Sequence, residues 1–247
     1  MPHSMTQKVN TYALRAFRDT ADKDYIHARM DYKAALYPQF LWSSLHALEK
    51  YAKCILILTR VPKPQKRAEY INHEVNKAIA LLHDRVDIIL SEQTRNFICR
   101  LENGAEDRYL GVSWVAQEVE LAVLDRAVWE LRRYCNSSLY IYSDNDFLEV
   151  KPNAYDVLKL IDKPIHQNTH ISGGFIEETL KNKESSARPE LVWSNLYYTN
   201  SNRKSVKMKN YPLMFENSPF CLYPEIIDEV AKYSFVPPKV RNTYKNK

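Results

Sequence analysis

The feature that most constrains this chain is the spacing of its apolar residues over the first 136 positions, which recur at steps of three and four. Such steps place side chains on one face of an α-helix. Between about Thr11 and Leu36 the stripe is Leu14, Phe17, Ala21, Tyr25, Ala28, Tyr32 and Leu36. Residues 38–60 and 113–135 carry similar stripes. Successive amphipathic helices bury their stripes against one another, so the sequence predicts an up-and-down helical bundle.

Local signals predict where these helices begin and end. Pro38 suits the first turn of the second helix, and the two prolines of "VPKPQK" end it. Two shorter helices are expected within residues 68–103, with a break near residues 83–85. Gly104 is expected to end the second of them in a left-handed conformation. Ser113 is then expected to cap the last helix of the bundle.

The character of the chain changes after about residue 136. Residues 136–152 alternate in polarity and predict a strand or short hairpin. Later segments are rich in Asn, Tyr, Pro and Lys, and one more short helix is expected within residues 224–235. The expected fold is therefore mostly α: a bundle over residues 1–136, and a less regular extension over residues 137–247 that packs on it.

Composition excludes several functional classes. The chain has only four glycines and neither the P-loop nor the dinucleotide-binding pattern, so we expect no nucleotide cofactor of those kinds. It has no apolar stretch of about 20 residues, which argues against a membrane helix. The N-terminus lacks the apolar core of a signal peptide, and the four cysteines are scattered. These features favour a cytoplasmic protein. The net charge of +5 is a mild excess that favours polyanions only in general.

Two motifs of the bundle resemble those of the HEPN family (higher eukaryotes and prokaryotes nucleotide-binding). The second predicted helix contains "SLHALEKYAKCILIL", with Glu49, Lys50 and Lys53. The next begins with "NHEVNKAIALL", in which His73 is followed by an acidic and an aliphatic residue. Both match the pattern of that family, and the resemblance covers about residues 13–134.

The resemblance implies a function and a site. Many HEPN proteins are metal-independent ribonucleases that act as homodimers in antiviral defence or toxin systems, with an Arg and a His separated by four to six residues. An Arg binds phosphate through its planar donors, and a His moves the proton of the attacking hydroxyl. Here "RNFICR" supplies Arg95 and Asn96, but Arg100 stands where the His is expected. Arg100 cannot act as a general base, although it could bind phosphate.

Other residues could complete such a site. Arg67 and His73 have the spacing of the Arg–His motif, although His73 could simply pack at a helix start. Near the "RNFICR" motif, Glu92, Arg108 and Tyr109 are candidate substrate contacts. The plain alternative is a solvated helix face with ion pairs, and a tyrosine that anchors a loop.

Two patterns in the extension also have simpler explanations. His166 and His170 have a spacing compatible with metal binding, but no further ligands accompany them, so we expect no metal site. The segment 195–212 combines aromatic and basic residues that could bind single-stranded RNA, or could form an ordinary loop docked on the bundle. Its candidates are Tyr197, Tyr198, Tyr211, Lys204, Lys207 and Lys209.

Taken together, the sequence leads us to expect a HEPN-like RNA-binding protein. If it is an enzyme, the resemblance implies a metal-independent endoribonuclease with a degenerate motif at Arg95 and Arg100. The alternative is a non-catalytic dimerisation or sensor module that has lost its nuclease activity. A third possibility is a module that binds a small nucleotide or metabolite in a polar pocket.

Overall fold

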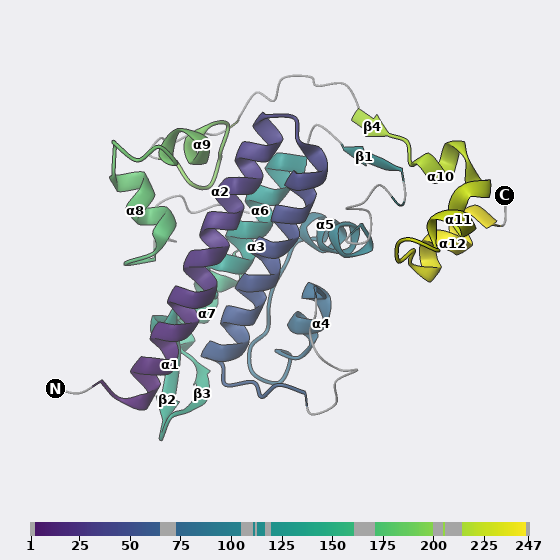
Figure 1. Cartoon of the computed structure of the whole chain (residues 1–247). Helices are drawn as coiled ribbons and strands as arrows, with labels where there is room; N and C mark the ends of the chain where they lie inside the picture. Colours follow the sequence, from purple (N-terminus) through teal and green to yellow (C-terminus); the bar gives the residue numbers. More distant parts are fainter. Residues whose placement is uncertain are drawn as a thin grey trace.

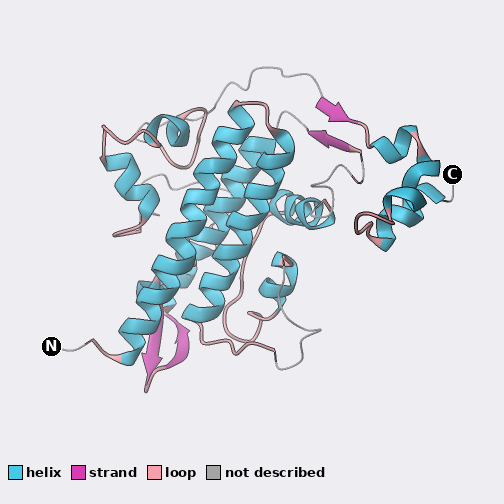
Figure 2. Cartoon of the chain, viewed as in Figure 1, coloured by secondary structure: helices cyan, strands magenta, loops and turns pink. Residues whose placement is uncertain are grey.

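The computed structural model describes residues 3–64, 73–104, 111, 113–116, 120–160, 171–199, 205 and 214–245. Within these residues the fold is mostly helical, with two small antiparallel ladders of two strands each. Figures 1 and 2 show helices at the centre of the molecule and the ladders toward its periphery. The predicted fold class is confirmed. No described helix is long and apolar enough to cross a membrane.

The centre of the bundle is formed by a first helical rod, α3 (Tyr37–Leu58) and α6 (Glu120–Arg132) (Figure 1). The first helical rod consists of α1 (Met5–Ala13), a π-helical turn (Leu14–Arg18) and α2 (Asp19–Lys33). The long first helix was predicted correctly, but it is interrupted by the π-helical turn, which apolar spacing does not reveal. The wider turn accompanies the buried Arg18, whose Nη2 donates to the carbonyl of Gly173 at 3.0 Å.

Two shorter helices, α4 (Val75–Ala80) and α5 (Glu92–Asn103), follow with the expected break between them. The side chain of Ser91 caps α5, because its Oγ accepts a hydrogen bond from the amide of Thr94 at 3.3 Å. The prediction for Gly104 was wrong. Its φ of −88° is right-handed, so α5 ends without a left-handed residue.

The predicted helix start at Ser113 was also wrong. Residues Trp114–Ala116 form strand β1, which pairs with β4 (Met214–Glu216), and the described part of α6 starts at Glu120. Ser113 contacts the distant segment too, since its Oγ accepts a hydrogen bond from the amide of Ser218 at 3.0 Å. A partner strand a hundred residues away determines the local structure here, and local periodicity does not report on such a partner.

The expected hairpin is present as β2 (Tyr140–Ser143) and β3 (Asp146–Val150), preceded by a 3₁₀ turn at Ser137–Leu139. Asp144 and Asn145 have φ values of +46° and +74°, as a tight hairpin turn requires. Figure 1 places the hairpin beside α1 at the lower end of the bundle. The carbonyl of Asn145 accepts a hydrogen bond from Arg60 Nε at 3.2 Å, which fixes the turn against the end of α3.

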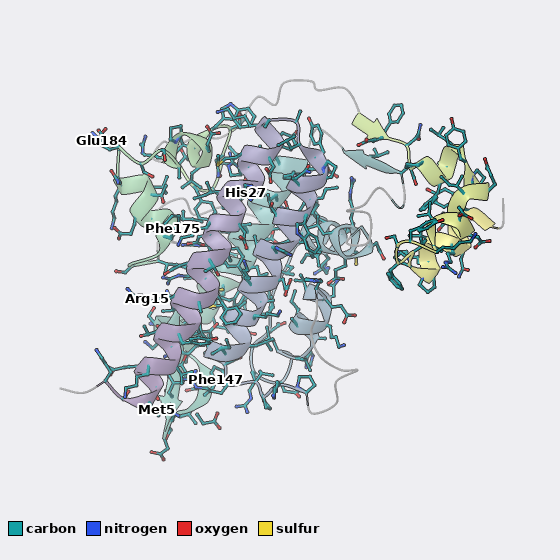
Figure 3. The ribbon with its side chains drawn as sticks, viewed as in Figure 1. Met5, Arg15, His27, Phe147, Phe175 and Glu184 are labelled. Atoms are coloured by element: carbon teal, nitrogen blue, oxygen red, sulfur yellow. The ribbon has the colours of Figure 1, made fainter. Side chains whose placement is uncertain are left out.

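After the hairpin come the short helix α7 (Pro152–Leu158), then α8 (Phe175–Lys181) and α9 (Arg188–Val192). Both α8 and α9 pack against α2. Figure 3 places Phe175 beside α2, where the Nζ of Lys23 lies 5.1 Å from the centre of its ring. A network of buried charges also joins α8 to the bundle, because Arg132 on α6 pairs with carboxylates of both α2 and α8.

The last described residues surround a small apolar cluster of their own. Its elements are α10 (Pro219–Leu222), a 3₁₀ turn (Pro224–Ile226), α11 (Ile227–Val230) and α12 (Pro238–Lys245). Its buried residues are Ile227, Val236, Val240 and Tyr244. The short helix expected within residues 224–235 is therefore confirmed. Figure 1 shows this cluster at the right of the bundle, next to the β1–β4 ladder. A domain boundary near residue 136 stays a prediction.

Candidate functional site

Helix α5 presents one polar face to solvent. Its opposite face is buried in the bundle through Thr94, Phe97, Ile98 and Leu101. Arg95 and Asn96 fall between these buried positions and are exposed, as is Glu92 one turn earlier. Three of the residues predicted to form a site, Glu92, Arg95 and Asn96, therefore share an accessible surface.

The Arg95 guanidinium is oriented by its own helix start. Its Nη1 donates to the carbonyl of Leu90 at 2.5 Å. A guanidinium has five N–H donors in a fixed plane, so this contact holds the group while it leaves other donors for a ligand. No ion pair joins Arg95 to Glu92 in the part of the chain that the structure describes.

Arg100 lies in a different environment from Arg95. Its Nη1 lies 2.5 Å from Glu120 Oε1, its Nη2 donates to the carbonyl of Val115, and 34% of its side chain is exposed. The Glu120 carboxylate is only 4% exposed. Arg100 therefore links α5 to β1 and α6, and a phosphate would have to compete with a buried carboxylate for it. A phosphate site shared by Arg95 and Arg100 stays a prediction.

His73, the other predicted catalytic residue, belongs to a second polar cluster. Its Nδ1 lies 2.9 Å from Glu49 Oε2 on α3. The ring of His46, also on α3, is stacked at 22° to that of His73, with centroids 5.7 Å apart. Trp42 packs against both imidazoles, with centroid distances of 4.1 Å to His46 and 5.2 Å to His73. One ligand atom from each of His46, Glu49 and His73 lies within 4.8 Å of the others.

Burial and charge define the electrostatics of this cluster. Burial lowers the pKa of His46, although Glu49 opposes the shift, so its imidazole is neutral near pH 7. The Glu49 carboxylate is 10% exposed and is contacted at its other oxygen by Lys53 Nζ, one turn along α3. His73 has 46% of its side chain exposed, so the cluster opens to solvent on that side.

The two candidate regions lie on adjoining helices. The amide of Asn76 on α4 donates to Glu102 Oε1 on α5 at 2.7 Å, and its side-chain Nδ2 donates to Oε2 at 2.7 Å. These bonds tie the start of α4, just after His73, to the end of α5. The arrangement of the His73 cluster thus depends on the same packing that exposes Arg95.

Several predicted residues lie outside the described part of the chain. These are Arg67, Arg108, Tyr109, His166, His170, Lys204, Lys207, Lys209 and Tyr211. Of the other tyrosines considered for base stacking, Tyr198 is buried, and the hydroxyl of Tyr197 accepts a hydrogen bond from Arg126 Nε at 3.1 Å. Both therefore support the alternative that this segment docks on the bundle.

Sequence reasoning did not single out His46 or assign Glu49 a place in a site. Their spacing of three on one helix was visible in "HALE", and it places both side chains on one face. The approach of His73 was not visible, because it depends on how α4 folds back onto α3.

Comparison with known proteins adds no assignment: no family model matches the chain, and neither the curated proteins nor the solved structures include a significant match. The polar face of α5 and the His73 cluster are therefore the two regions whose geometry bears on function.

Proposed function

We propose that this chain is a HEPN-like RNA-binding module that contacts the phosphate backbone through Arg95 and Asn96. The observation that supports the proposal is the orientation of Arg95: its guanidinium is held by the Leu90 carbonyl while the side chain stays accessible. A fixed, exposed guanidinium binds phosphate with little loss of side-chain entropy. Asn96 is exposed beside it and offers an amide that can donate to a phosphate or a sugar hydroxyl.

The proposal assigns binding, and not cleavage, to this face of α5. Arg100 replaces the expected His and is paired with Glu120, and His73 faces Glu49. Metal-independent cleavage needs a group that can accept a proton near neutral pH. In this proposal the chain therefore shares RNA binding with the defence and toxin ribonucleases that it resembles, and does not share their cleavage of RNA. The homodimer that the resemblance implies would present two such faces.

Binding of a labelled single-stranded RNA, measured by fluorescence anisotropy at several salt concentrations, tests the proposal. Arg95→Ala should weaken binding of all RNA sequences alike and lower the slope of log Kd against log salt by about one, because one phosphate contact is lost. Arg15→Ala is the matched control: Arg15 is also exposed, is labelled in Figure 3 on the first helical rod, and its loss changes the net charge equally.

Equal affinities and slopes for the wild type, Arg95→Ala and Arg15→Ala would refute the assignment. Incubation of RNA with the wild-type protein in EDTA should leave the RNA intact. Cleavage that disappears in Arg95→Ala would instead establish the ribonuclease that the family resemblance implies.

A further inference from the structure

We propose that His46, Glu49 and His73 form a binding site for one first-row divalent metal ion, with Zn²⁺ as the best-suited ion. The inference is independent of RNA binding at α5, because it involves none of the residues assigned to that face. It rests on three side chains of the right chemistry whose ligand atoms already lie within 4.8 Å of one another.

The distances between the three ligand atoms need only small changes to suit a zinc ion. Zinc binds imidazole nitrogen and carboxylate oxygen at about 2.0–2.2 Å, so tetrahedral ligand atoms lie about 3.4 Å apart. The His73 Nδ1 and Glu49 Oε2 atoms are 2.9 Å apart, so these two atoms must separate by about 0.5 Å. The remaining atoms lie within 4.8 Å of one another, so they must approach by about 1.4 Å at most, which small rotations of the half-exposed His73 and of the Glu49 carboxylate can supply.

The scaffold positions two of the three ligands before any ion binds. His46 and Glu49 are one helical turn apart on α3, which runs through the middle of the bundle, so their relative position is fixed by the helix. Trp42 packs closely on the His46 ring, at a centroid distance of 4.1 Å, and more loosely on the His73 ring, at 5.2 Å, so His46 is the more firmly held of the two imidazoles. An ion would insert between His73 Nδ1 and Glu49 Oε2, which now contact each other directly, while Lys53 keeps its contact with the second carboxylate oxygen.

The donor set determines which ion fits. Two imidazoles and one carboxylate suit zinc and its first-row neighbours, whereas Mg²⁺ and Ca²⁺ prefer oxygen ligands alone. Three protein ligands leave at least one position for water or a small anion, which is the arrangement of zinc sites that carry an exchangeable ligand. Asp24, which lies close enough to influence His46, is held by Lys50 Nζ at 2.5 Å and is not needed in the set.

Zinc titration with a competing chromophoric chelator tests the site directly. The wild-type chain should bind one Zn²⁺ at this site. His46→Ala and His73→Ala should each weaken it by more than about 100-fold, since the loss of a mere outer-shell partner already costs 10–100-fold. His83→Ala is the matched control, because this imidazole is 90% exposed and lies outside the cluster. The double variant His166→Ala, His170→Ala tests the other histidine pair of the sequence.

Lys53 supplies a test in the opposite direction. Its ammonium group competes with the ion for Glu49 and repels it, so Lys53→Met should bind Zn²⁺ at least about fivefold more tightly. An adventitious surface histidine would not respond to this change. Co²⁺ should also quench part of the total tryptophan fluorescence of the wild type. In Trp42→Phe this quenched part should be absent.

Circular dichroism establishes that each variant is folded, and the exposed His73 provides a substitution that the fold tolerates. The proposal is overturned if zinc affinity is unchanged in both His46→Ala and His73→Ala. It is also overturned if binding is lost only in the double variant at positions 166 and 170. Failure here leaves the RNA-binding assignment untouched, because that test monitors Arg95 and not metal.

Discussion

Replacing Arg132 with Met should strongly destabilise the fold at pH 7 and much less at pH 5. Arg132 is fully buried and bridges two buried carboxylates, Asp22 on α2 and Glu177 on α8. Its Nε and Nη2 donate to Asp22 at 2.7 and 2.8 Å, and its Nη1 and Nη2 donate to Glu177 at 2.8 and 2.7 Å. Both pairs are bidentate, so one substitution leaves two buried carboxyl groups without a cation.

The magnitude follows from the protons that these carboxyl groups must take up to stay buried. Carboxyl groups of unfolded chains titrate near pH 4, so protonating one costs about 4 kcal/mol at pH 7 and about 1–1.5 kcal/mol at pH 5. Some partners remain, because Tyr51 and the Ile176 amide donate to Asp22 and the Ile171 amide donates to Glu177. We therefore expect a loss of about 4–7 kcal/mol at pH 7 and below about 3 kcal/mol at pH 5.

The sign of the pH effect is specific to this explanation. In Arg132→Met the folded state binds more protons than the unfolded state near neutrality, so its stability rises as the pH falls. Urea unfolding followed by circular dichroism at pH 5 and pH 7 measures the loss of stability at both pH values.

Arg133→Met is the matched control, because Arg133 is also buried but donates to the carbonyls of Glu130 and Leu160. Its deficit should be similar at both pH values. An Arg132→Met deficit below about 1 kcal/mol at pH 7, or one that does not shrink at pH 5, would refute the reasoning.

Three further outcomes are expected from urea unfolding. Ser91→Ala removes the cap of α5 and should cost about 1 kcal/mol; no change would mean that solvent replaces the cap. Gly174→Ala would place a methyl group against the Glu177 carboxylate and 2.6 Å from Arg132 Nη2, and should cost about 1–3 kcal/mol; a neutral result would show that the pair moves freely. Burial raises the pKa of Glu177, but the Arg132 guanidinium outweighs it and the net pKa is lowered. This carboxylate therefore stabilises the fold above about pH 4.5, and the contribution is lost as the pH falls through its lowered pKa. Glu177→Gln should show a shallower acid dependence than the wild type, and parallel curves would contradict the assignment.

The bundle could be predicted from the sequence because its helices are defined by local spacing. The stripe that begins at Leu14 is buried largely as expected, and Pro38 lies in the first turn of α3. The hairpin was visible for the same reason, since alternation and a polar turn are local signals. The π-helical turn and the strand at residues 114–116 were not: the turn contains Arg18, which bonds to Gly173, and the strand pairs with residues about a hundred positions away.

The buried charges were the least predictable part of the fold. Asp22, Arg29 and Arg132 look like the solvated face of an amphipathic helix, yet all three are buried. Their partners lie on other elements: Arg29 pairs with Asp125 on α6 and donates to the carbonyl of Glu190 at 3.0 Å. The candidate sites follow the same rule, since Arg95 could be found from its motif, whereas the approach of His73 to His46 required the folded chain.

The position of Glu177 in the sequence also has a consequence for biosynthesis. Asp22 and Arg132 are both synthesised before their third partner, which follows Arg132 by 45 residues. At about 5–20 residues per second, the ribosome needs roughly 2–9 s to add this segment. Until Glu177 has been synthesised, Asp22 is the one of these two carboxylates available to Arg132, and α8 cannot cover α2. The charge network that joins α8 to the bundle is therefore completed only late in synthesis.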